Sequence, residues 1–365
     1  MRVLIVNAGS SSLKLRLLDD ADTLLARTDL PAGPNGVDTG AVSGAIAAWP
    51  RPDLVAHRIV HGGTEFTQAV RIDERVRARL RALTDLAPLH QPTSLAGLDA
   101  VTTALPGVPA VACFDTAFHT SIPPAAATYA VPAEWRQHYG VRRYGFHGLS
   151  HAYASHRAVQ LAGVPVEGSR VVTCHLGAGA SLCAVRDGLS VDTTMGFTPL
   201  EGLVMATRSG SVDPGLVLWL EEHEHLSPHE VATALEQRSG LLALAGTADM
   251  RVVEQHAADG DPDASLALDV YQRRLVASIA AMTAALDGLD LLVFTGGVGE
   301  NSPHVRADAA KRLEWLGVAI DAERNHTAAP DADVSSQGAQ VRTLVIAARE
   351  DLQIAAEVRR LGNSW

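Results

Sequence analysis

One arrangement, an apolar strand followed by a glycine-rich turn and a second apolar strand, occurs twice in this chain, roughly half a chain apart. The first copy is RVLIVNAGSSSLKLRLLDD, from Arg2, and the second is RVVTCHLGAGASLCAVRDG, from Arg170. A simple hairpin needs only about two turn residues, whereas both turns here are longer and carry small residues after Asn7 or His175. Turns of this kind expose backbone N–H groups that bind anions. The repeat therefore predicts two domains of like fold, each with an anion-binding turn.

Strand and helix patterns alternate along the rest of the chain. Short apolar runs at 53–61 and 108–115 predict strands, and residues 74–87 between them have helical spacing. A third predicted strand, at 289–295, leads into a third glycine turn in TGGVGEN. This alternation predicts an α/β protein. The chain of 365 residues is too long for one typical core, so two domains are expected.

The charge balance narrows the class of substrate and partner. The formal net charge is −11 at pH 7, and an acidic surface argues against nucleic acid as a partner. If the substrate is an anion, arginines must be concentrated around it. Lysine is rare in this chain, with Lys14 and Lys311 the only two, and Lys14 directly follows the first glycine-rich turn.

Cysteine usage and hydropathy predict a cytoplasmic protein without a membrane partner. The three cysteines, Cys113, Cys174 and Cys183, show no CxxC spacing, so we interpret them as reduced core residues. The opening run MRVLIVNAGS lacks the cleavage region of a signal peptide. No stretch of about 18 uncharged apolar residues predicts a transmembrane helix.

Two common nucleotide-binding motifs are missing from their required positions. Neither GxxxxGK[ST] nor GxGxxG occurs between a predicted strand and a predicted helix. The sequence therefore predicts neither a P-loop protein nor a dinucleotide-binding protein. Two phosphate-binding hairpins, together with a glycine turn for a nucleoside, instead indicate the actin-like kinase fold.

Eight sequence blocks, in order and over nearly the whole chain, resemble the acetate and propionate kinase family. They are VNAGSSSLK from Val6, HRIVHGG from His57, LAPLHQP from Leu86, CFDTAFH from Cys113, YGFHGLSH from Tyr144, HLGAGAS from His175, DTTMGFTPLEGLVMATRSGSVDP from Asp192 and FTGGVGEN from Phe294. The resemblance implies two actin-like (ribonuclease H-like) domains with a nucleotide cleft between them, residues 1–117 plus 352–365 and residues 118–351. It also implies a homodimer that catalyses reversible phosphoryl transfer from ATP to acetate, giving acetyl phosphate and ADP. The implied cofactor is Mg²⁺, with Mn²⁺ as its substitute.

The implied reaction needs cations and hydrogen-bond donors more than it needs a general base. A carboxylate, already ionised at neutral pH, attacks the γ-phosphoryl group directly and in line, and charge builds up on the equatorial oxygens. The resemblance assigns the cationic role to Arg58 and Arg208, because guanidinium groups bind carboxylate and phosphate in a bidentate manner. It makes His147 and His175 donors near the phosphates. It gives Asp115 a magnesium-linked role in positioning the nucleotide.

The resemblance also implies which residues bind the two substrates and the metal ion. An acyl pocket beside Arg58 is expected from Val60, Leu89, Phe146 and Pro199, which would be ordinary core residues without the resemblance. Asn7 and Glu350 are the expected metal-linked residues. The expected ATP-binding residues are Ser10, Ser12, Lys14, His175, Gly177, Ala178, Gly179, Asp249, Met250, Arg251, Gly296, Gly297, Val298, Gly299 and Asn301.

The chain departs from the family pattern at one of these positions and beside another. Ala178 stands where the family usually has the asparagine of HLGNG, so the backbone N–H groups from Gly177 to Ser181 are expected to bind the phosphates. Glu350, in REDLQIA, corresponds to the first glutamate of the family's usual Asn-Glu-Glu, and Arg349 replaces the asparagine. The histidine-rich run EEHEHLSPHE, from Glu221, resembles a metal site, but its acidic neighbours favour a solvated helix end.

Three functions remain open from the sequence. The first is an acetate kinase and the second is a related kinase that prefers propionate, because one methylene in an apolar pocket changes specificity by only about 1–3 kcal/mol. The third is an actin-like nucleotide-binding protein that transfers no phosphoryl group. The paired arginines argue against the third, because hydrolysis of ATP by water does not need arginines that hold a carboxylate substrate.

Overall fold

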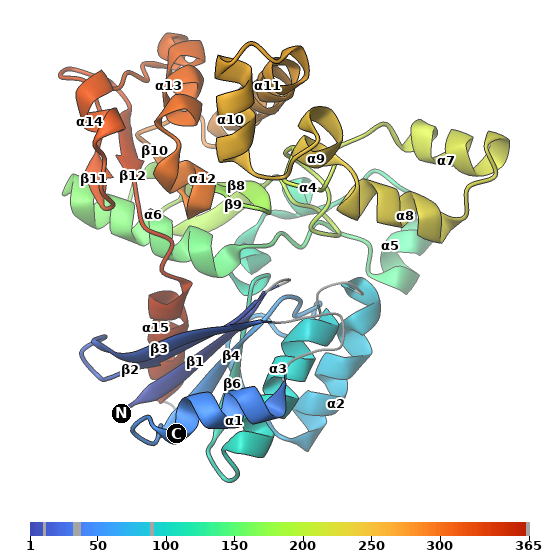
Figure 1. The fold of residues 1–365 in the computed structure, drawn as a ribbon, viewed down its shortest axis with the longest axis vertical. Helices are drawn as coiled ribbons and strands as arrows, with labels where there is room; N and C mark the ends of the chain where they lie inside the picture. Colours follow the sequence, from blue (N-terminus) through green and yellow to red (C-terminus); the bar gives the residue numbers. More distant parts are fainter. Residues whose placement is uncertain (10–11, 32–37, 88–90, 363–365) are drawn as a thin grey trace. The chain divides into compact units, whose positions relative to one another are not determined.

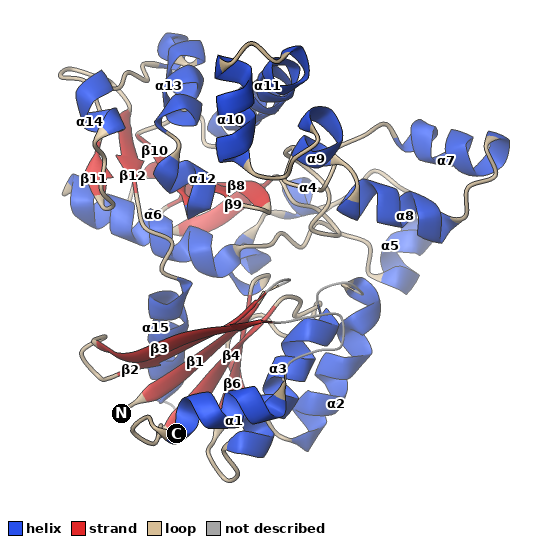
Figure 2. Cartoon of the chain, in the orientation of Figure 1, coloured by secondary structure: helices blue, strands red, loops and turns tan. Residues whose placement is uncertain are grey.

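The computed structural model describes residues 1–9, 12–31, 38–87 and 91–362. The chain divides into two compact units (Figure 1). Unit 1 comprises Met1–Thr120, Phe146–Tyr153 and Arg349–Trp365, and unit 2 comprises Ser121–Gly145 and Ala154–Ala348. Each unit contains one six-stranded sheet with helices around it (Figure 2). The predicted α/β class is confirmed.

The sheet of unit 1 has the strand order β3-β2-β1-β4-β6-β5. Strands β1, β4 and β6 are parallel neighbours, and β2 returns antiparallel to β1. The strands are β1 (Val3–Ala8), β2 (Ser12–Leu18), β3 (Leu24–Pro31), β4 (Leu54–Ile59), β5 (Val70–Arg71) and β6 (Ala110–Phe114). The helices are α1 (Thr39–Ala47), α2 (Glu74–Ala82), α3 (Gln91–Ala104) and α15 (Glu350–Gly362), with 3₁₀ turns η1 (Leu83–Leu86) and η2 (Ala117–Ser121).

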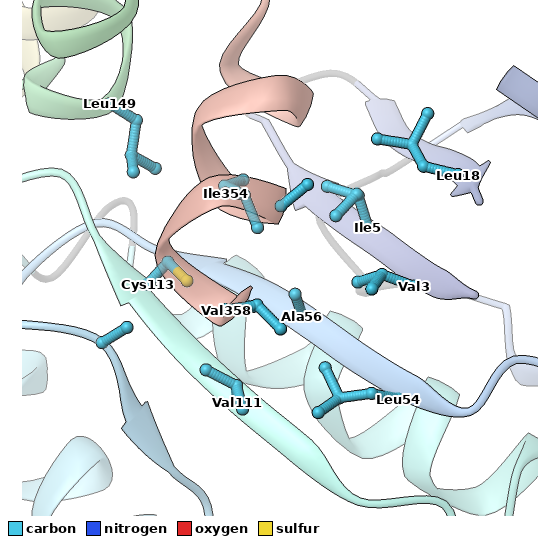
Figure 3. Packing of buried hydrophobic residues seen from close by; sticks show 12 residues of the cluster. Val3, Ile5, Leu18, Leu54, Ala56, Val111, Cys113, Leu149, Ile354 and Val358 are labelled. Carbon is cyan, nitrogen blue, oxygen red and sulfur yellow. The ribbon is translucent and has the colours of Figure 1, made fainter. Parts of the chain in front are cut away.

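Both faces of this sheet are buried, which explains why β1 is an unbroken apolar run. Successive strand residues point to opposite faces. Val3 and Ile5 pack in a cluster with residues of α15 (Figure 3), whereas Leu4 and Val6 pack in a cluster with residues of α1 and α3. In a parallel sheet covered on both faces, binding residues lie beyond the carboxyl ends of the strands.

The sheet of unit 2 has the order β11-β12-β10-β7-β8-β9. Its strands are β7 (Arg170–Leu176), β8 (Ala180–Arg186), β9 (Leu189–Thr193), β10 (Leu291–Thr295), β11 (Ala332–Asp333) and β12 (Arg342–Val345). Helix α6 (Gly148–Ala162) begins in unit 1 and continues in unit 2. The other helices are α4 (Pro124–Ala127), α5 (Ala133–Tyr139), α7 (Pro214–His223), α8 (Pro228–Gln237), α9 (Gly240–Ala245), α10 (Met250–Ala258), α11 (Pro262–Ala285), α12 (Gly296–Asn301), α13 (Pro303–Arg312), η3 (Glu314–Leu316) and α14 (Ala322–His326).

The two predicted hairpins are confirmed, and each has one antiparallel and one parallel neighbour on its first strand. Strand β1 pairs antiparallel with β2 and parallel with β4, and β7 pairs antiparallel with β8 and parallel with β10. The predicted third glycine turn is wrong, because helix α12 begins at Gly296. Side chains stabilise this short helix: Glu300 accepts from the Gly296 N–H, and the Asn301 amide donates to the Gly297 carbonyl.

Three smaller predictions can also be compared with the structure. The histidine-rich run forms the end of α7 and the start of α8, where Ser227 and Glu230 make a capping box, and its side chains from residue 222 onward are exposed. All three cysteines are buried and free. Within the described ranges, no helix is long and apolar enough to cross a membrane.

Candidate active site

Four predicted residues come together at the carboxyl edge of the unit 1 sheet. Asn7 is near the end of β1, Arg58 is near the end of β4, and Asp115 directly follows β6. Because these three strands are parallel neighbours, their ends meet at one edge of the sheet. Glu350, the first residue of α15, completes the group although it lies 343 residues from Asn7 in the chain.

Arg58 is the centre of this group. Its Nε and Nη2 donate to Oδ1 and Oδ2 of Asp115 at 3.0 and 2.5 Å, which is a bidentate ion pair. Its Nη1 donates to Oδ1 of Asn7 at 3.2 Å, and Nε lies 3.6 Å from Oε2 of Glu350. The Asn7 amide in turn donates to Oε2 of Glu350 at 2.7 Å. Within the described part of the chain, two of the five N–H groups of the guanidinium remain for a ligand.

Burial and charge act against each other in this group. Burial raises the pKa of Asp115 to about 6; Arg58 opposes the rise and the nearby Glu350 adds to it. Burial opposes the charge of Arg58, but Asp115 and Glu350 outweigh it and raise the pKa of Arg58. At neutral pH the Asp115 carboxylate is therefore ionised and paired.

The backbone beside His147 is held close to Asp115. His147 has φ +55, and the next residue, Gly148, donates its N–H to the Asp115 carbonyl at 2.9 Å. A Cβ atom at Gly148 would lie 2.2 Å from that carbonyl oxygen, so only glycine fits there. His119 Nε2 lies 2.9 Å from the carbonyl oxygen of Phe146 and so holds the residue that precedes His147. His147 is therefore placed near the Asp115 group by the folding of GFHG.

The predicted acyl-pocket residues are distributed over both units. Val60 and Phe146, both buried, belong to unit 1, and the ring of His61 meets Phe146 edge-on at 5.5 Å. Pro199 belongs to unit 2, and its carbonyl accepts from Nη1 of Arg208 at 3.0 Å. Leu89 lies outside the described residues.

The first predicted phosphate turn can be followed in part. Its Gly9 N–H donates to the Ser12 carbonyl at 2.9 Å. Ser12 is half-buried at the start of β2, and Lys14 is exposed and pairs in register with Asn7. Ser10 lies outside the described residues.

In unit 2, the second predicted phosphate turn and the start of α12 lie next to each other. His175 at the end of β7 pairs with Thr295 at the end of β10. A Cβ atom at Gly296 would lie 2.8 Å from the Leu176 carbonyl oxygen, and one at Gly177 would lie 4.0 Å from the Gly297 nitrogen. The predicted phosphate-binding turn and the predicted nucleoside-binding segment therefore form one surface of this unit.

Arg208 differs from Arg58 because it forms no ion pair with a carboxylate among the described residues. Its Nη1 donates to the Pro199 carbonyl and to Sδ of Met205, at 3.0 and 3.6 Å. Burial lowers its pKa, with Glu236 only partly opposing this. The loop that carries it is joined to the second turn, because the Ala206 N–H donates to the Ala178 carbonyl at 3.1 Å. Arg208 is thus a partly buried cation suited to an anionic ligand.

The remaining predicted ATP-binding residues lie on α10 and α12. Asp249 is the N-cap of α10 and forms an ion pair with the exposed Arg251, while Met250 is buried. Gly297 and Asn301 of α12 are exposed. The other two predicted residues of this helix are Val298 and Gly299, which are half-buried and buried.

Several residues that support this site were not predicted. Glu201 accepts from Arg143 at 2.8 Å and from the Tyr129 hydroxyl at 2.5 Å, and this group holds the loop that carries Pro199. Glu300 lies inside the predicted FTGGVGEN block without having been assigned a role. The partners of Glu201 are distant in sequence, and Glu300 joins the nearby Gly296 to the distant Ala348, so no local pattern indicates these contacts.

Comparison with solved structures identifies the class of protein. The chain resembles an acetate kinase from Porphyromonas gingivalis, with a TM-score of 0.89 and 34% identity over 98% of this chain and 99% of that one. It resembles a propionate kinase from Francisella tularensis with a TM-score of 0.90 and 34% identity over 98% of both chains. The fold and the site therefore define a kinase built from two actin-like α/β domains.

Sequence comparison then identifies the family. The model of the acetokinase family matches residues 49–356. The chain is 40% identical to the acetate kinase of Acetivibrio thermocellus over 99% of both proteins, and 42% identical to that of Microcystis aeruginosa over 98% of both. This protein belongs to the acetokinase family, and the resemblance inferred from the eight blocks is confirmed.

Proposed function

We propose that this protein is an acetate kinase, which transfers the γ-phosphoryl group of ATP to acetate reversibly and releases ADP. The observation that carries the proposal is Arg208, a partly buried guanidinium whose hydrogen bonds go only to neutral acceptors in the described residues. The names of full-length relatives support the choice of acetate.

In this mechanism the protein neutralises two anions as they meet. Arg208 stabilises the negative charge that spreads over the equatorial oxygens in the transition state. His147 and His175 donate hydrogen bonds to the phosphoryl group or its neighbours. Arg58 offers its two remaining N–H groups to an anionic oxygen while its ion pair keeps Asp115 in place. No residue needs to remove a proton, because acetate reacts as the carboxylate.

The donor set in unit 1 suits Mg²⁺. Asn7, Asp115 and Glu350 offer amide and carboxylate oxygens, and Mg²⁺ binds through one or two carboxylates plus substrate phosphates while keeping several waters. The described residues contain no group of three or more histidine, cysteine, aspartate or glutamate side chains able to hold a metal ion, so the proposed ion would also take oxygens from the nucleotide phosphates and from water. We propose that Asn7 and Glu350 are linked to the ion and that Asp115 positions the nucleotide. The ion, when bound, neutralises charge on the phosphates.

The assignment is tested by trapping acyl phosphate with hydroxylamine. Purified protein with ATP, Mg²⁺ and a high acetate concentration is expected to yield the hydroxamate, and omission of Mg²⁺ is expected to abolish it. If no trappable product forms although ADP is released, the protein hydrolyses nucleotide without transferring phosphoryl to acetate, and the proposal fails.

The second candidate function is a propionate kinase, which the resemblance to the Francisella tularensis propionate kinase supports.

We expect Val60→Ala to raise the ratio of kcat/KM for propionate to that for acetate, because the change shortens a buried side chain in the proposed acyl pocket. The expected gain is about tenfold, the scale of one methylene. Both substrates are measured with the same enzyme preparation, and an unchanged ratio would remove Val60 from the pocket.

The second turn leads to a prediction about Ala178. The Gly177 N–H donates to the Gly179 carbonyl at 2.9 Å, and its expected contact with phosphate stays a prediction. The N–H groups of Ala178 and Gly179 have no acceptor among the described residues, and the Ala178 side chain is exposed. We expect Ala178→Asn to change kcat/KM for ATP by less than about tenfold, because backbone donors bind the phosphates. A gain of a hundredfold would show that the native turn is impaired.

The implied assembly and location belong to the same proposal. We propose a cytoplasmic homodimer. The domains at 1–117 plus 352–365 and at 118–351 stay a prediction, and the two compact units differ from them by including residues 118–120, 146–153 and 349–351 in unit 1. The support is the family resemblance over the whole chain. The molar mass of the purified protein in solution tests the dimer.

A further inference from the structure

We propose that Glu300 is a positioning residue for the nucleotide, acting through the backbone of α12. The inference rests on the proposed function, because α12 is the segment expected to contact the nucleotide. Glu300 is itself outside the set of predicted binding residues. It shapes the binding surface without contributing a ligand contact of its own.

One oxygen of Glu300 joins two separate parts of unit 2. Oε1 accepts from the Gly296 N–H at 3.0 Å and from the Ala348 N–H at 2.9 Å. Gly296 is the first residue of α12, and Ala348 is the last residue of unit 2 before the chain passes into unit 1 at Arg349. Charged acceptors make stronger hydrogen bonds than neutral ones. This oxygen therefore ties the start of the helix to residues 346–348, the crossing segment, which leads the chain into unit 1.

The start of α12 depends on this contact. The first N–H groups of a helix have no acceptor within the helix, and the N-cap residue Thr295 supplies no side-chain acceptor. Gly296 has φ +79 and packs closely against the Leu176 carbonyl, so its backbone has little freedom to find another partner. The Glu300 carboxylate therefore sets the orientation of the exposed Gly297 that follows.

The other end of α12 is held independently. Arg306, which is buried, donates through Nη1 to the carbonyls of Gly299 and Glu300, both at 2.9 Å. Within α12, loss of the Glu300 carboxylate consequently frees only the N-terminal end; outside the helix it frees the Ala348 N–H. Any effect on nucleotide binding then arises from a shift at Gly296 and Gly297 while the rest of the helix stays in place.

The crossing segment itself provides a matched control. Its three consecutive N–H groups donate to three different acceptors: Ile346 to the Phe294 carbonyl, Ala347 to Oδ1 of Asp331 and Ala348 to Glu300. Asp331 also accepts from Arg157, and none of its bonds in the described structure reaches α12. Asp331→Ala therefore loosens the same segment without touching the helix.

The test compares Glu300→Ala, Glu300→Gln and Asp331→Ala with the parent enzyme. Steady-state kinetics give KM for ATP, KM for acetate and kcat; calorimetric titration gives the Kd of ADP; and thermal melting reports folding. We expect Glu300→Ala to raise KM for ATP and Kd for ADP by about tenfold or more, the scale of one lost charge-assisted hydrogen bond. KM for acetate should stay within about twofold.

The two other variants separate positioning from general stability. Glu300→Gln keeps an acceptor oxygen in the same place and is expected to restore most of the ATP affinity. Asp331→Ala is expected to lower the melting temperature while leaving Kd for ADP within about twofold. The proposal is overturned if both alanine variants weaken ADP binding equally, or if Glu300→Ala leaves ADP binding unchanged.

ADP titration also keeps this proposal distinct from the proposed function. If the parent protein binds ADP but forms no acyl phosphate, the proposed function fails, and a selective loss of ADP affinity in Glu300→Ala still supports the role of Glu300. If the parent protein binds no ADP, both proposals are overturned.

Discussion

Arg208→Ala is expected to lower kcat for acetyl phosphate formation by at least about a hundredfold, the scale for losing one donor to transition-state charge. The side chain is partly buried and donates its hydrogen bonds to neutral acceptors in the described structure, so its charge is available to the reacting phosphoryl group. Burial already disfavours this cation and lowers its pKa. Arg208 forms no ion pair among the described residues, and Glu236 is the acidic residue that acts on its charge, so we expect the denaturant midpoint to fall by less than it does in Arg58→Ala.

Chemical rescue makes this prediction sharper. Guanidine added at millimolar concentration should restore part of the kcat of Arg208→Ala, because a free guanidinium can enter the space of the missing side chain. Arg312→Ala serves as the control, since Arg312 pairs with exposed aspartates on α11 and α13 outside every predicted binding residue. Turnover near that of the parent enzyme in Arg208→Ala would remove this arginine from the mechanism.

The strands and hairpins could be predicted because their cause is local. A strand buried on both faces must be apolar at every position, and Val3–Val6 satisfies this in the sequence and in the fold. Glycine and serine directly after such a run leave few structures other than a tight, N–H-rich turn. The hairpins after β1 and β7 were therefore visible from composition and order alone.

Helix α12 shows where local signals mislead. Glycines at 296, 297 and 299 predict a turn, because glycine disfavours helix by about 1 kcal/mol per residue. The helix forms because the Glu300 side chain satisfies its first N–H and Arg306 binds its last carbonyls. Arg306 belongs to the next helix, α13, and it also donates to the Asn325 carbonyl. Interactions of this kind cannot be read from six residues.

In the candidate active site, the sequence indicated which residues take part but not which of them pair. The sequence blocks contain Asn7, Arg58 and Asp115, and the family resemblance added Glu350, but neither indicated which of these side chains pair. The pairing of Arg58 with Asp115 spans 57 residues and that of Asn7 with Glu350 spans 343. Only the parallel order of β1, β4 and β6, with α15 against the same sheet, brings these side chains together. The sequence therefore could not show that most of the Arg58 N–H groups bind oxygens of the protein, or that Arg208 donates only to neutral acceptors in the described residues.

Because Arg58 is paired with a buried carboxylate, Arg58→Ala is expected to impair folding as well as activity. The side chains of Arg58 and Asp115 are only 13% and 1% exposed. Removing the guanidinium leaves a buried carboxylate beside Glu350 without its cation. Breaking a buried ion pair from one side costs about 3–5 kcal/mol of unfolding free energy. Denaturant unfolding at about pH 8 measures this loss, and kcat should also fall at least about a hundredfold.

The pH dependence identifies Asp115 as the source of that instability. Burial already raises its pKa to about 6 against the opposition of Arg58, and without Arg58 the pKa rises further. A carboxyl group whose folded pKa exceeds its unfolded value near 3.8 binds protons more readily when folded, so the unfolding free energy falls as pH rises through that range. The deficit of Arg58→Ala relative to the parent protein should therefore be largest near pH 8 and should shrink towards about pH 5. Adding Asp115→Asn to Arg58→Ala removes the buried charge and should recover most of the lost stability at pH 8 without recovering activity. A deficit that is constant with pH, or one that the second substitution leaves in place, would show that Arg58 stabilises unit 1 through packing and not through its pairing with Asp115.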